Sequence, residues 1–339
     1  MSVWQNLFYG GLLPVHSWLR TLVPSIDTAV LMYHELARDD TDIEAWTVLR
    51  ESDFLRQIEY LNSHYDIVSL DKALAQMEAR TPRERPMAVV TFDDGDLGNA
   101  TVLLPIVEAL KIPITVYIAT RQIAEGSPYW FDRIINALQG RGTRTVDLKK
   151  HGLGRYEINR VHGKKNWYRI SCLLEDLKSL APDTRTAAVE TVLSCVDAPA
   201  PGRDSQIKPM SIFDLKALAA CPFITIGAHS HCHNILTQLR PEAIEESVKL
   251  SKELLEQWSG QPVAHFAYPD GRYDDTVTDT VRRAGFRSAV TTNGRLWSGE
   301  DSSLHIPRIG VGRYDSLEQV KFRLTGGIRG FFPWRDAAR

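Results

Sequence analysis

The stretch VVTFDDGD (residues 89–96) places two carboxylates side by side at the end of an apolar run. Its β-branched residues predict a buried strand, and Asp-Asp-Gly is typical of the turn that follows one. In a parallel sheet, polar residues at the carboxyl ends of the strands gather on the face that carries the active site. Whether Asp93 and Asp94 form only a turn or part of a site therefore depends on the other strands.

Six further runs are also short, apolar and rich in residues that favour β structure. They are residues 28–34, 113–119, 223–229, 264–269, 287–292 and 304–311. Stretches with apolar residues at helical spacing separate several of them, as in PEAIEESVKLSKELLEQWSG (241–260). Strands that alternate with helices predict a parallel sheet or a (β/α) barrel.

Residues 128–212 interrupt this alternation. Stretches such as WYRISCLLEDLKSL (167–180) have helical periodicity and are joined by polar loops. We expect a helical insertion at about 128–212 inside a main domain at 28–315. An apolar helical segment at 1–27 precedes the main domain in this prediction, and a C-terminal helix and tail follow at 316–339.

The composition is typical of a globular protein with a packed core. The chain has 339 residues, is 43% hydrophobic and carries a net charge of -2, which argues against a nucleic-acid partner. Its four cysteines form no CxxC pair and are typical of reduced thiols. Residues 1–24 have neither a basic start nor an A-x-A cleavage site, so we expect a cytoplasmic protein. The aromatic residues of this segment leave open a peripheral contact with a membrane surface.

The segment HSHCH (229–233) is the clearest indication of metal chemistry. His229 and His233 are four residues apart, which lets two imidazoles converge on one ion. With one carboxylate they form a two-His, one-Asp site that leaves positions open for water and substrate. The alternative is a His-rich loop that binds nothing. If His229 and His233 converge, His231 points elsewhere.

Three segments resemble motifs of the polysaccharide deacetylase family, which is of the NodB-homology, carbohydrate esterase family 4 type. They are TFDDG (91–95), HSHCH read as H-[ST]-x-x-H, and FAYPDGRYD (266–274). The resemblance extends from about Val30 to Gly312. It implies a distorted (β/α) barrel of about seven parallel strands and the metal-dependent removal of N-acetyl groups from a hexosamine.

The resemblance also implies roles for individual residues. Asp93 matches the catalytic base, which deprotonates a metal-bound water nucleophile. Asp94, His229 and His233 match the ligands of a divalent ion, for which zinc is expected. Ser230 is expected to support the loop by hydrogen bonding.

Substrate and oxyanion contacts are expected near the third motif and at the end of the first strand. A backbone N–H near Asp270 matches the oxyanion donor of the family, and Tyr268 and His34 are further candidates. The family's general acid is a late histidine. His305 matches it by position along the chain, and His34 is the alternative.

The third motif departs from the family pattern. Many members carry an arginine there that pairs with the catalytic Asp, whereas this chain has Ala267. Arg272 follows five residues later, and whether it replaces the missing arginine is left open. His265 is expected to be a core histidine.

Four aromatic residues of the insertion have two interpretations. Tyr129, Trp130, Phe131 and Trp167 are either helix-packing residues or a wall on which a sugar stacks.

The sequence therefore predicts a metal-dependent hydrolase that removes an N-acetyl group from a sugar of a polysaccharide or lipid-linked glycan precursor. Two alternatives remain. The first is an amidase or imidase of the same fold that acts on a small cyclic amide. The second is a non-catalytic glycan-binding relative.

Overall fold

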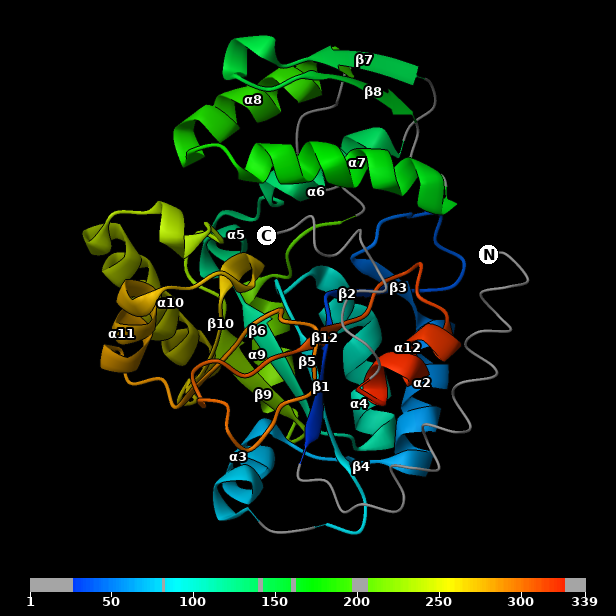
Figure 1. The fold of residues 1–339 in the computed structure, drawn as a ribbon, viewed down its shortest axis with the longest axis vertical. Coiled ribbons are helices and arrows are strands. Elements are labelled where there is room, and N and C mark those ends of the chain that lie inside the picture. Colours follow the sequence, from blue (N-terminus) through cyan, green and yellow to red (C-terminus); the bar gives the residue numbers. More distant parts are fainter. Residues whose placement is uncertain (1–26, 81–82, 140–142, 160–162, 197–206, 327–339) are drawn as a thin grey trace.

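The computed structural model describes residues 27–80, 83–139, 143–159, 163–196 and 207–326. Its centre is a parallel sheet with the strand order β11-β10-β9-β6-β5-β1-β12 (Figure 1). The strands are β1 (Thr28–Tyr33), β5 (Met87–Phe92), β6 (Ile114–Ile118), β9 (Ile224–Ala228), β10 (His265–Ala267), β11 (Ser288–Val290) and β12 (Ile309–Gly310). A short strand, β4 (Asp66–Ile67), also pairs with β5. All seven predicted strands are present, and the predicted barrel class is confirmed.

One segment near the C-terminus links the two edges of the curled sheet. Ile306 forms a parallel bridge with Val290 in β11, and Ile309 pairs with Leu31 in β1. Residues 306–310 therefore run from one edge strand to the other. This link brings residues far apart in the sequence to one place inside the barrel.

Successive strand residues alternate between the barrel interior and the outer, helix-covered face. Leu31, Val90 and Ile226 belong to the outer core, whereas Val30 and Val89 belong to the inner one. Because both faces are buried, the sequences of the strands are continuous apolar runs.

The helices of the main domain are α2 (Glu51–His64), α3 (Leu70–Ala79), α4 (Leu104–Leu110), α5 (Thr120–Glu125), α9 (Ile212–Ala220), α10 (Pro241–Ser259), α11 (Asp275–Arg283) and α12 (Leu317–Leu324).

Helix α3 covers the amino ends of the strands. Its Leu70 and Leu74 pack in the inner core, and the Thr28 hydroxyl, at the start of β1, donates to Met77 Sδ. The carboxyl ends open on the opposite side, where the insertion lies (Figure 1).

The insertion has a hydrophobic core of its own. It contains α6 (Trp130–Leu138), β7 (Thr143–Asp147), β8 (Arg155–Asn159), α7 (Gly163–Lys178) and α8 (Pro182–Cys195). This core also includes Ala37 and Val48, which belong to the small β2 (Glu35–Ala37) and β3 (Val48–Arg50) sheet of the main domain. The insertion is therefore attached to the barrel mainly through that sheet.

The antiparallel pair β7–β8 was not predicted, because the insertion was expected to be helical. Of the strand residues whose burial the structure describes, Val146 and Ile158 are buried in the insertion core, and Tyr156 is partly buried against it. Two short strands that contribute so few apolar residues give little periodic signal.

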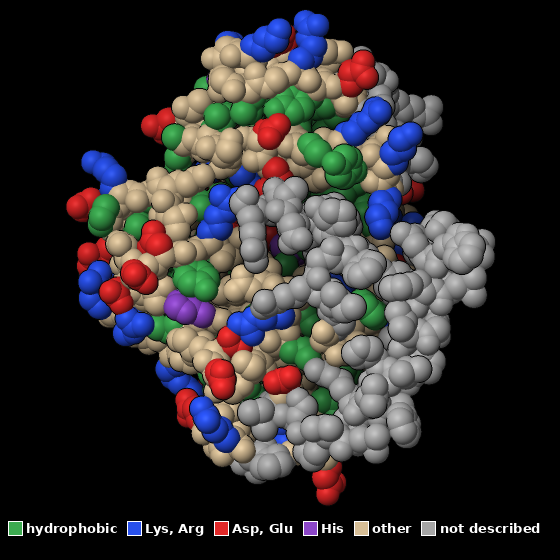
Figure 2. Space-filling view, in the orientation of Figure 1, with side chains coloured by type: hydrophobic (Ala, Val, Ile, Leu, Met, Phe, Trp, Pro, Cys, Tyr) green, Lys and Arg blue, Asp and Glu red, His purple; other side chains and the backbone are tan. Residues whose placement is uncertain are grey.

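Two predicted segments lie partly outside the described residues. The segment 1–27 lies outside them except for Asp27, and of residues 316–339 the structure describes α12 and its immediate flanks. Among the described residues, no helix combines the length and the apolar character needed to cross a membrane. Charged side chains of both signs are scattered over the face shown in Figure 2.

Candidate active site

The two adjacent aspartates diverge because the chain turns sharply after β5. The Asp93 N–H still donates to Tyr33 O at 2.9 Å, as a continuation of the β1–β5 pairing. Asp94 and Gly95 both have positive φ angles, 75° and 84°. Asp93 therefore stays at an inward strand position two residues after Thr91, whereas Asp94 turns toward the loop after β9.

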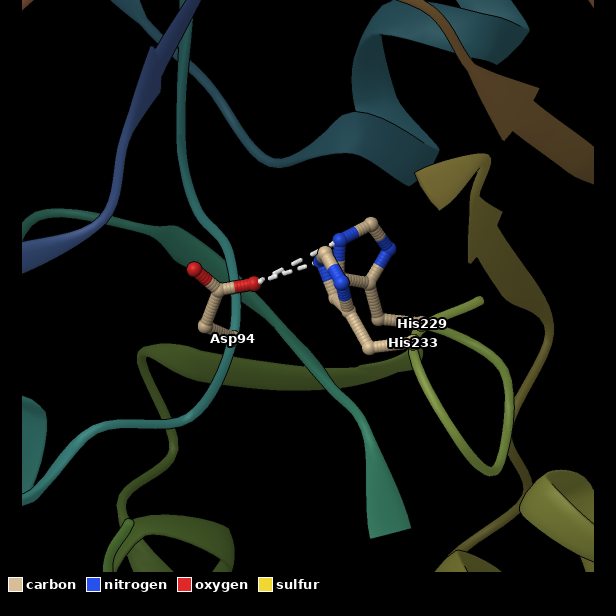
Figure 3. Close-up of side chains that lie close together, drawn as sticks. All are labelled: Asp94, His229 and His233. Atoms are coloured by element: carbon tan, nitrogen blue, oxygen red, sulfur yellow. Dashed lines mark ion pairs between the residues drawn. The ribbon is translucent and has the colours of Figure 1, made fainter. Parts of the chain in front are cut away.

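Asp94, His229 and His233 converge at the carboxyl end of the sheet (Figure 3). Asp94 Oδ1 lies 3.6 Å from His229 Nε2 and 3.1 Å from His233 Nε2. His229 directly follows β9, and its N–H donates to Ile118 O. Ser230 Oγ accepts the His233 N–H at 3.1 Å, which is the loop-supporting bond expected of it. His233 itself has a φ of 53°.

The donor chemistry of this cluster fits a divalent ion. His229 Nδ1 donates to Ala267 O at 2.8 Å, so its Nε2 presents a lone pair toward Asp94. Burial lowers the pKa of His229 to about 4, so this imidazole is neutral at pH 7. Asp94 Oδ1 is buried without a hydrogen bond. A lone-pair donor that faces a buried, unpartnered carboxylate oxygen favours a cation between them, and a His₂Asp set is suited to zinc.

The catalytic-base candidate has a partner that sequence reasoning missed. Arg308 is fully buried, and its Nη1 and Nη2 donate to the two carboxylate oxygens of Asp93, each at 2.6 Å. Arg308 also donates to Thr91 Oγ1 and to Thr291 O. Burial alone would raise the pKa of Asp93, but Arg308, together with the nearby His229 and His34, holds the pKa below its usual value. Asp93 is therefore a fixed, ionised carboxylate at neutral pH.

Arg308 stands in place of the arginine that the third motif lacks. Arg272 does not replace it, since its Nε lies 2.9 Å from Asp270 Oδ2. The strand pattern contained a signal for Arg308. Ile306 faces the inner core and Ile309 the outer one, so alternation points Arg308, two residues after Ile306, into the barrel.

His34 lies beside the same carboxylates, at the end of β1. Burial lowers its pKa, while the charges of Asp94 and Asp93 act in the opposite direction. Its Nδ1 is buried without a hydrogen-bond partner. The ring meets Trp46 edge-on at 5.5 Å between centroids.

The structure places His305 elsewhere. Its ring stacks on Tyr273 with centroids 4.2 Å apart, and its Nε2 lies 3.1 Å from Thr278 Oγ1 in α11. These contacts are on the helix-covered side of the sheet. The position of His305 along the chain, which matched it to the family's late histidine, therefore did not place it at the site. Of the two acid candidates, His34 is the one that faces the aspartates.

The polar groups of Tyr268 also bond to residues away from Asp94, His229 and His233. Its hydroxyl donates to Leu304 O and its N–H to Val290 O, so neither donor faces the ligands. The predicted substrate or oxyanion role of Tyr268 is not supported. Asp270 has a φ of 59°, and its carboxylate contacts Lys178 and Arg272. An oxyanion contact from its backbone stays a prediction.

The remaining histidines and aromatic residues divide between packing and the site. His231 Nδ1 lies 2.8 Å from Thr120 Oγ1, and His265, a core residue as predicted, lies 2.8 Å from Ser288 Oγ. Trp167 packs in the insertion core, and Trp130 is half-buried beside Arg185. Tyr129 and Phe131, by contrast, both contact the His233 ring.

Comparison with known proteins agrees with this geometry. Residues 214–289 match the family model described as polysaccharide deacetylase, a range that contains the second and third motifs. A search of curated proteins finds no match. The predicted resemblance to the polysaccharide deacetylases is confirmed. The predicted enzyme class, a hydrolase of carbohydrate N-acetyl groups, is the class of that family.

Solved structures share the fold at low sequence identity. A Streptococcus pyogenes deacetylase, PplD, in complex with acetate is 17% identical, with a TM-score of 0.58 over 88% of this chain and 97% of its own. IcaB from Ammonifex degensii is also 17% identical, with a TM-score of 0.54 over 88% and 97%. A de-N-acetylase from Aggregatibacter actinomycetemcomitans is 10% identical, with a TM-score of 0.54 over 88% and 99%. At these identities the likeness defines the fold.

Proposed function

We propose that this protein is a metal-dependent N-deacetylase of an N-acetylated glycan. The observation that carries the proposal is the juxtaposition of two elements at the carboxyl ends of the strands. One is the Asp94, His229 and His233 cluster, and the other is the Asp93 carboxylate held by Arg308. A turn without a function has no reason to bury a bidentate ion pair beside such a cluster, because burying charges costs free energy.

Asp94, His229 and His233 hold the ion in this proposal. A divalent ion bound there would lower the pKa of a bound water and polarise the acetyl carbonyl. Asp93 accepts the proton, as a general base that is ionised before substrate arrives. Arg308 fixes both oxygens of Asp93, so the carboxylate does not reorient during the reaction.

The leaving amine needs a proton, and we assign its delivery to His34. The side chain lies in the field of Asp93 and Asp94, and its Nδ1 has no hydrogen-bond partner among the described residues. Replacement by Gln removes the acid and keeps a polar side chain of similar length. Acetate release should then fall by about 10²-fold or more, whereas His305→Gln should leave it near the wild-type rate.

The proposed substrate is an N-acetylated hexosamine in a polysaccharide or in a lipid-linked precursor. The PplD deacetylase, a protein of similar fold, is known in complex with acetate, which is the product that this reaction would release. We place the protein in the cytoplasm, with a peripheral membrane contact through residues 1–24.

The direct test is acetate release by the zinc-loaded protein from a panel of N-acetylhexosamine oligosaccharides. The proposal expects release by the wild type and by His231→Ala, and loss in Asp93→Asn. A small cyclic amide in the same panel tests the amidase alternative. Zinc-loaded wild-type protein that releases acetate from no glycan of the panel would refute the proposal.

A further inference from the structure

Three polar side chains of the insertion (residues 128–212) reach three loops of the barrel that carry the motifs. Tyr129 precedes α6, Lys178 ends α7, and Arg185 lies in α8. Tyr129 bonds Asp94 in the first motif, Lys178 bonds Asp270 in the third, and Arg185 bonds Asn234 directly after the second.

Tyr129 touches two of the three metal-ligand candidates. Its hydroxyl donates to Asp94 O at 2.5 Å, and its ring meets His233 edge-on at 5.1 Å between centroids. Asp94 has a left-handed φ of 75°, a conformation that is costly for a residue other than glycine and needs support from its surroundings. Tyr129 is almost fully buried, so its hydroxyl is committed to that support.

Arg185 holds the loop that contains the second motif. Its Nη2 donates to Asn234 Oδ1 at 2.6 Å, and Asn234 directly follows His233. The guanidinium lies 5.4 Å from the centre of the Trp130 ring. Since His233 also has a positive φ of 53°, this bond anchors a second strained ligand from the insertion side.

Lys178 holds the third motif. Its Nζ lies 2.8 Å from Asp270 Oδ1 and 2.7 Å from Glu175 Oε1. The carbonyl of Lys178 accepts a bond from Gln238 Nε2 at 2.8 Å, in the stretch that follows the second motif. Asp270 has a φ of 59°, so each of the three contacts ends at or next to a residue with left-handed backbone.

We propose that the insertion is the positioning element of the metal centre, with Tyr129 as its principal contact. This inference rests on the proposed function. The insertion is attached to the barrel on the β2–β3 side, by apolar packing and by the bonds between Gln139 and Glu44. The bonds of Tyr129, Lys178 and Arg185 end instead on the motif loops. The residues that attach the insertion to the barrel therefore differ from those that position the motif loops, so substitutions can test the two roles separately.

Tyr129→Phe tests the proposal, because it removes the hydroxyl and keeps the ring. We expect zinc affinity, measured by competition with a chromogenic chelator, to fall about 10–100-fold, the usual effect of losing a bond behind a metal ligand. The unfolding midpoint of the metal-free protein should move little. The matched control is Tyr156→Phe, whose hydroxyl donates to Asp176 Oδ2 at 2.6 Å inside the insertion. This control should keep wild-type affinity.

A second variant tests the same positioning role with a substitution in the barrel. Asn234→Ala removes the acceptor of Arg185 without touching the insertion, and it should also weaken zinc binding. Wild-type zinc affinity in both Tyr129→Phe and Asn234→Ala would overturn the proposal, as would an equal loss in Tyr156→Phe. Wild-type protein that binds zinc but releases no acetate would refute the proposed function alone. Wild-type protein that binds no zinc would overturn both.

Discussion

At the scale of single residues, the pairing of Asp93 with Arg308 is central. Both side chains are buried, and two charge-assisted bonds of 2.6 Å join them. Such a pair fixes direction as well as charge, which is what a proton acceptor at a defined place requires. The two residues are 215 positions apart in the sequence. Local reasoning therefore found the candidate base and missed its partner.

Arg308→Lys keeps the charge and loses the two-pronged geometry, since a lysine ammonium cannot bond both oxygens in one plane. We expect zinc content to stay at the wild-type level and acetate turnover to fall about 10²-fold. Arg133→Lys is the control, because Arg133 pairs with Glu190 inside the insertion. Full turnover in Arg308→Lys would show that the pair does not position the base.

The raised pKa of Glu35 predicts that the stability of the folded protein depends on pH. Burial raises its pKa to about 8, while a bond from the Gly98 N–H acts in the opposite direction. The folded state then holds a proton that the unfolded state has released above its ordinary pKa, about 4.5. Stability therefore falls as pH rises from about 4.5 to 8, by at most about 1.4 kcal/mol per pH unit from this group.

The Glu35→Gln variant removes this titration and keeps an acceptor for Gly98. Chemical unfolding of the metal-free protein at several pH values should show a flatter profile for the variant than for the wild type. Parallel profiles would mean that Glu35 does not carry the dependence. Burial also raises the pKa values of Asp96 and Asp132, and the charge of Glu35 adds to both shifts, so the profile of the variant becomes flatter but not level.

At the scale of elements, the seven strands were predictable because both faces of the sheet are buried. Each strand then carries an uninterrupted apolar signal. The hairpin β7–β8 gave no such signal, since few of its described residues, Val146 and Ile158 among them, enter a core. The candidate metal ligands His229 and His233 were predictable because they are four residues apart in the sequence. The misplacement of His305 has the opposite cause: its position along the chain did not determine which side of the sheet it faces.

The barrel interior is packed so closely at Gly227 that an added side chain should destabilise the protein. A Cβ at this position in β9 would lie 2.4 Å from Cδ1 of Tyr117, which is fully buried. Gly227→Ala should therefore destabilise the protein by roughly 1–3 kcal/mol, as overpacking of a core does. Gly154→Ala is a control, since nothing lies within 4 Å of its added Cβ. Equal unfolding midpoints for the two variants would contradict this account of the interior.

At the scale of the whole molecule, the barrel supplies the chemistry and the insertion lies over the carboxyl ends of its strands (Figure 1). The first motif ends at Gly95 and the third begins at Phe266, yet the parallel topology gathers them at one end. This much follows from the strand pattern. How the insertion docks does not, because its apolar contacts with β2–β3 and its polar bonds to the motif loops come from residues far from these partners in the sequence.

Residues 1–24 lie outside the described residues and carry a prediction from the sequence alone. Their aromatic and leucine side chains favour adsorption to a membrane surface. The full chain should then co-sediment with vesicles, and a chain lacking residues 1–24 should stay in solution. Full-length protein that stays in the supernatant at low salt would reject this prediction.

The most direct test of the central claim is the rate of acetate release against added zinc for Asp93→Asn and Asp94→Asn. If Asp94 holds the ion and Asp93 takes the proton, Asp94→Asn should regain activity as zinc is added, because an amide oxygen is a weaker ligand than a carboxylate. Asp93→Asn should stay low at every zinc concentration, about 10²–10⁴-fold below the wild type. Exchanged curves would exchange the two roles, and near-normal rates in both variants would contradict the account.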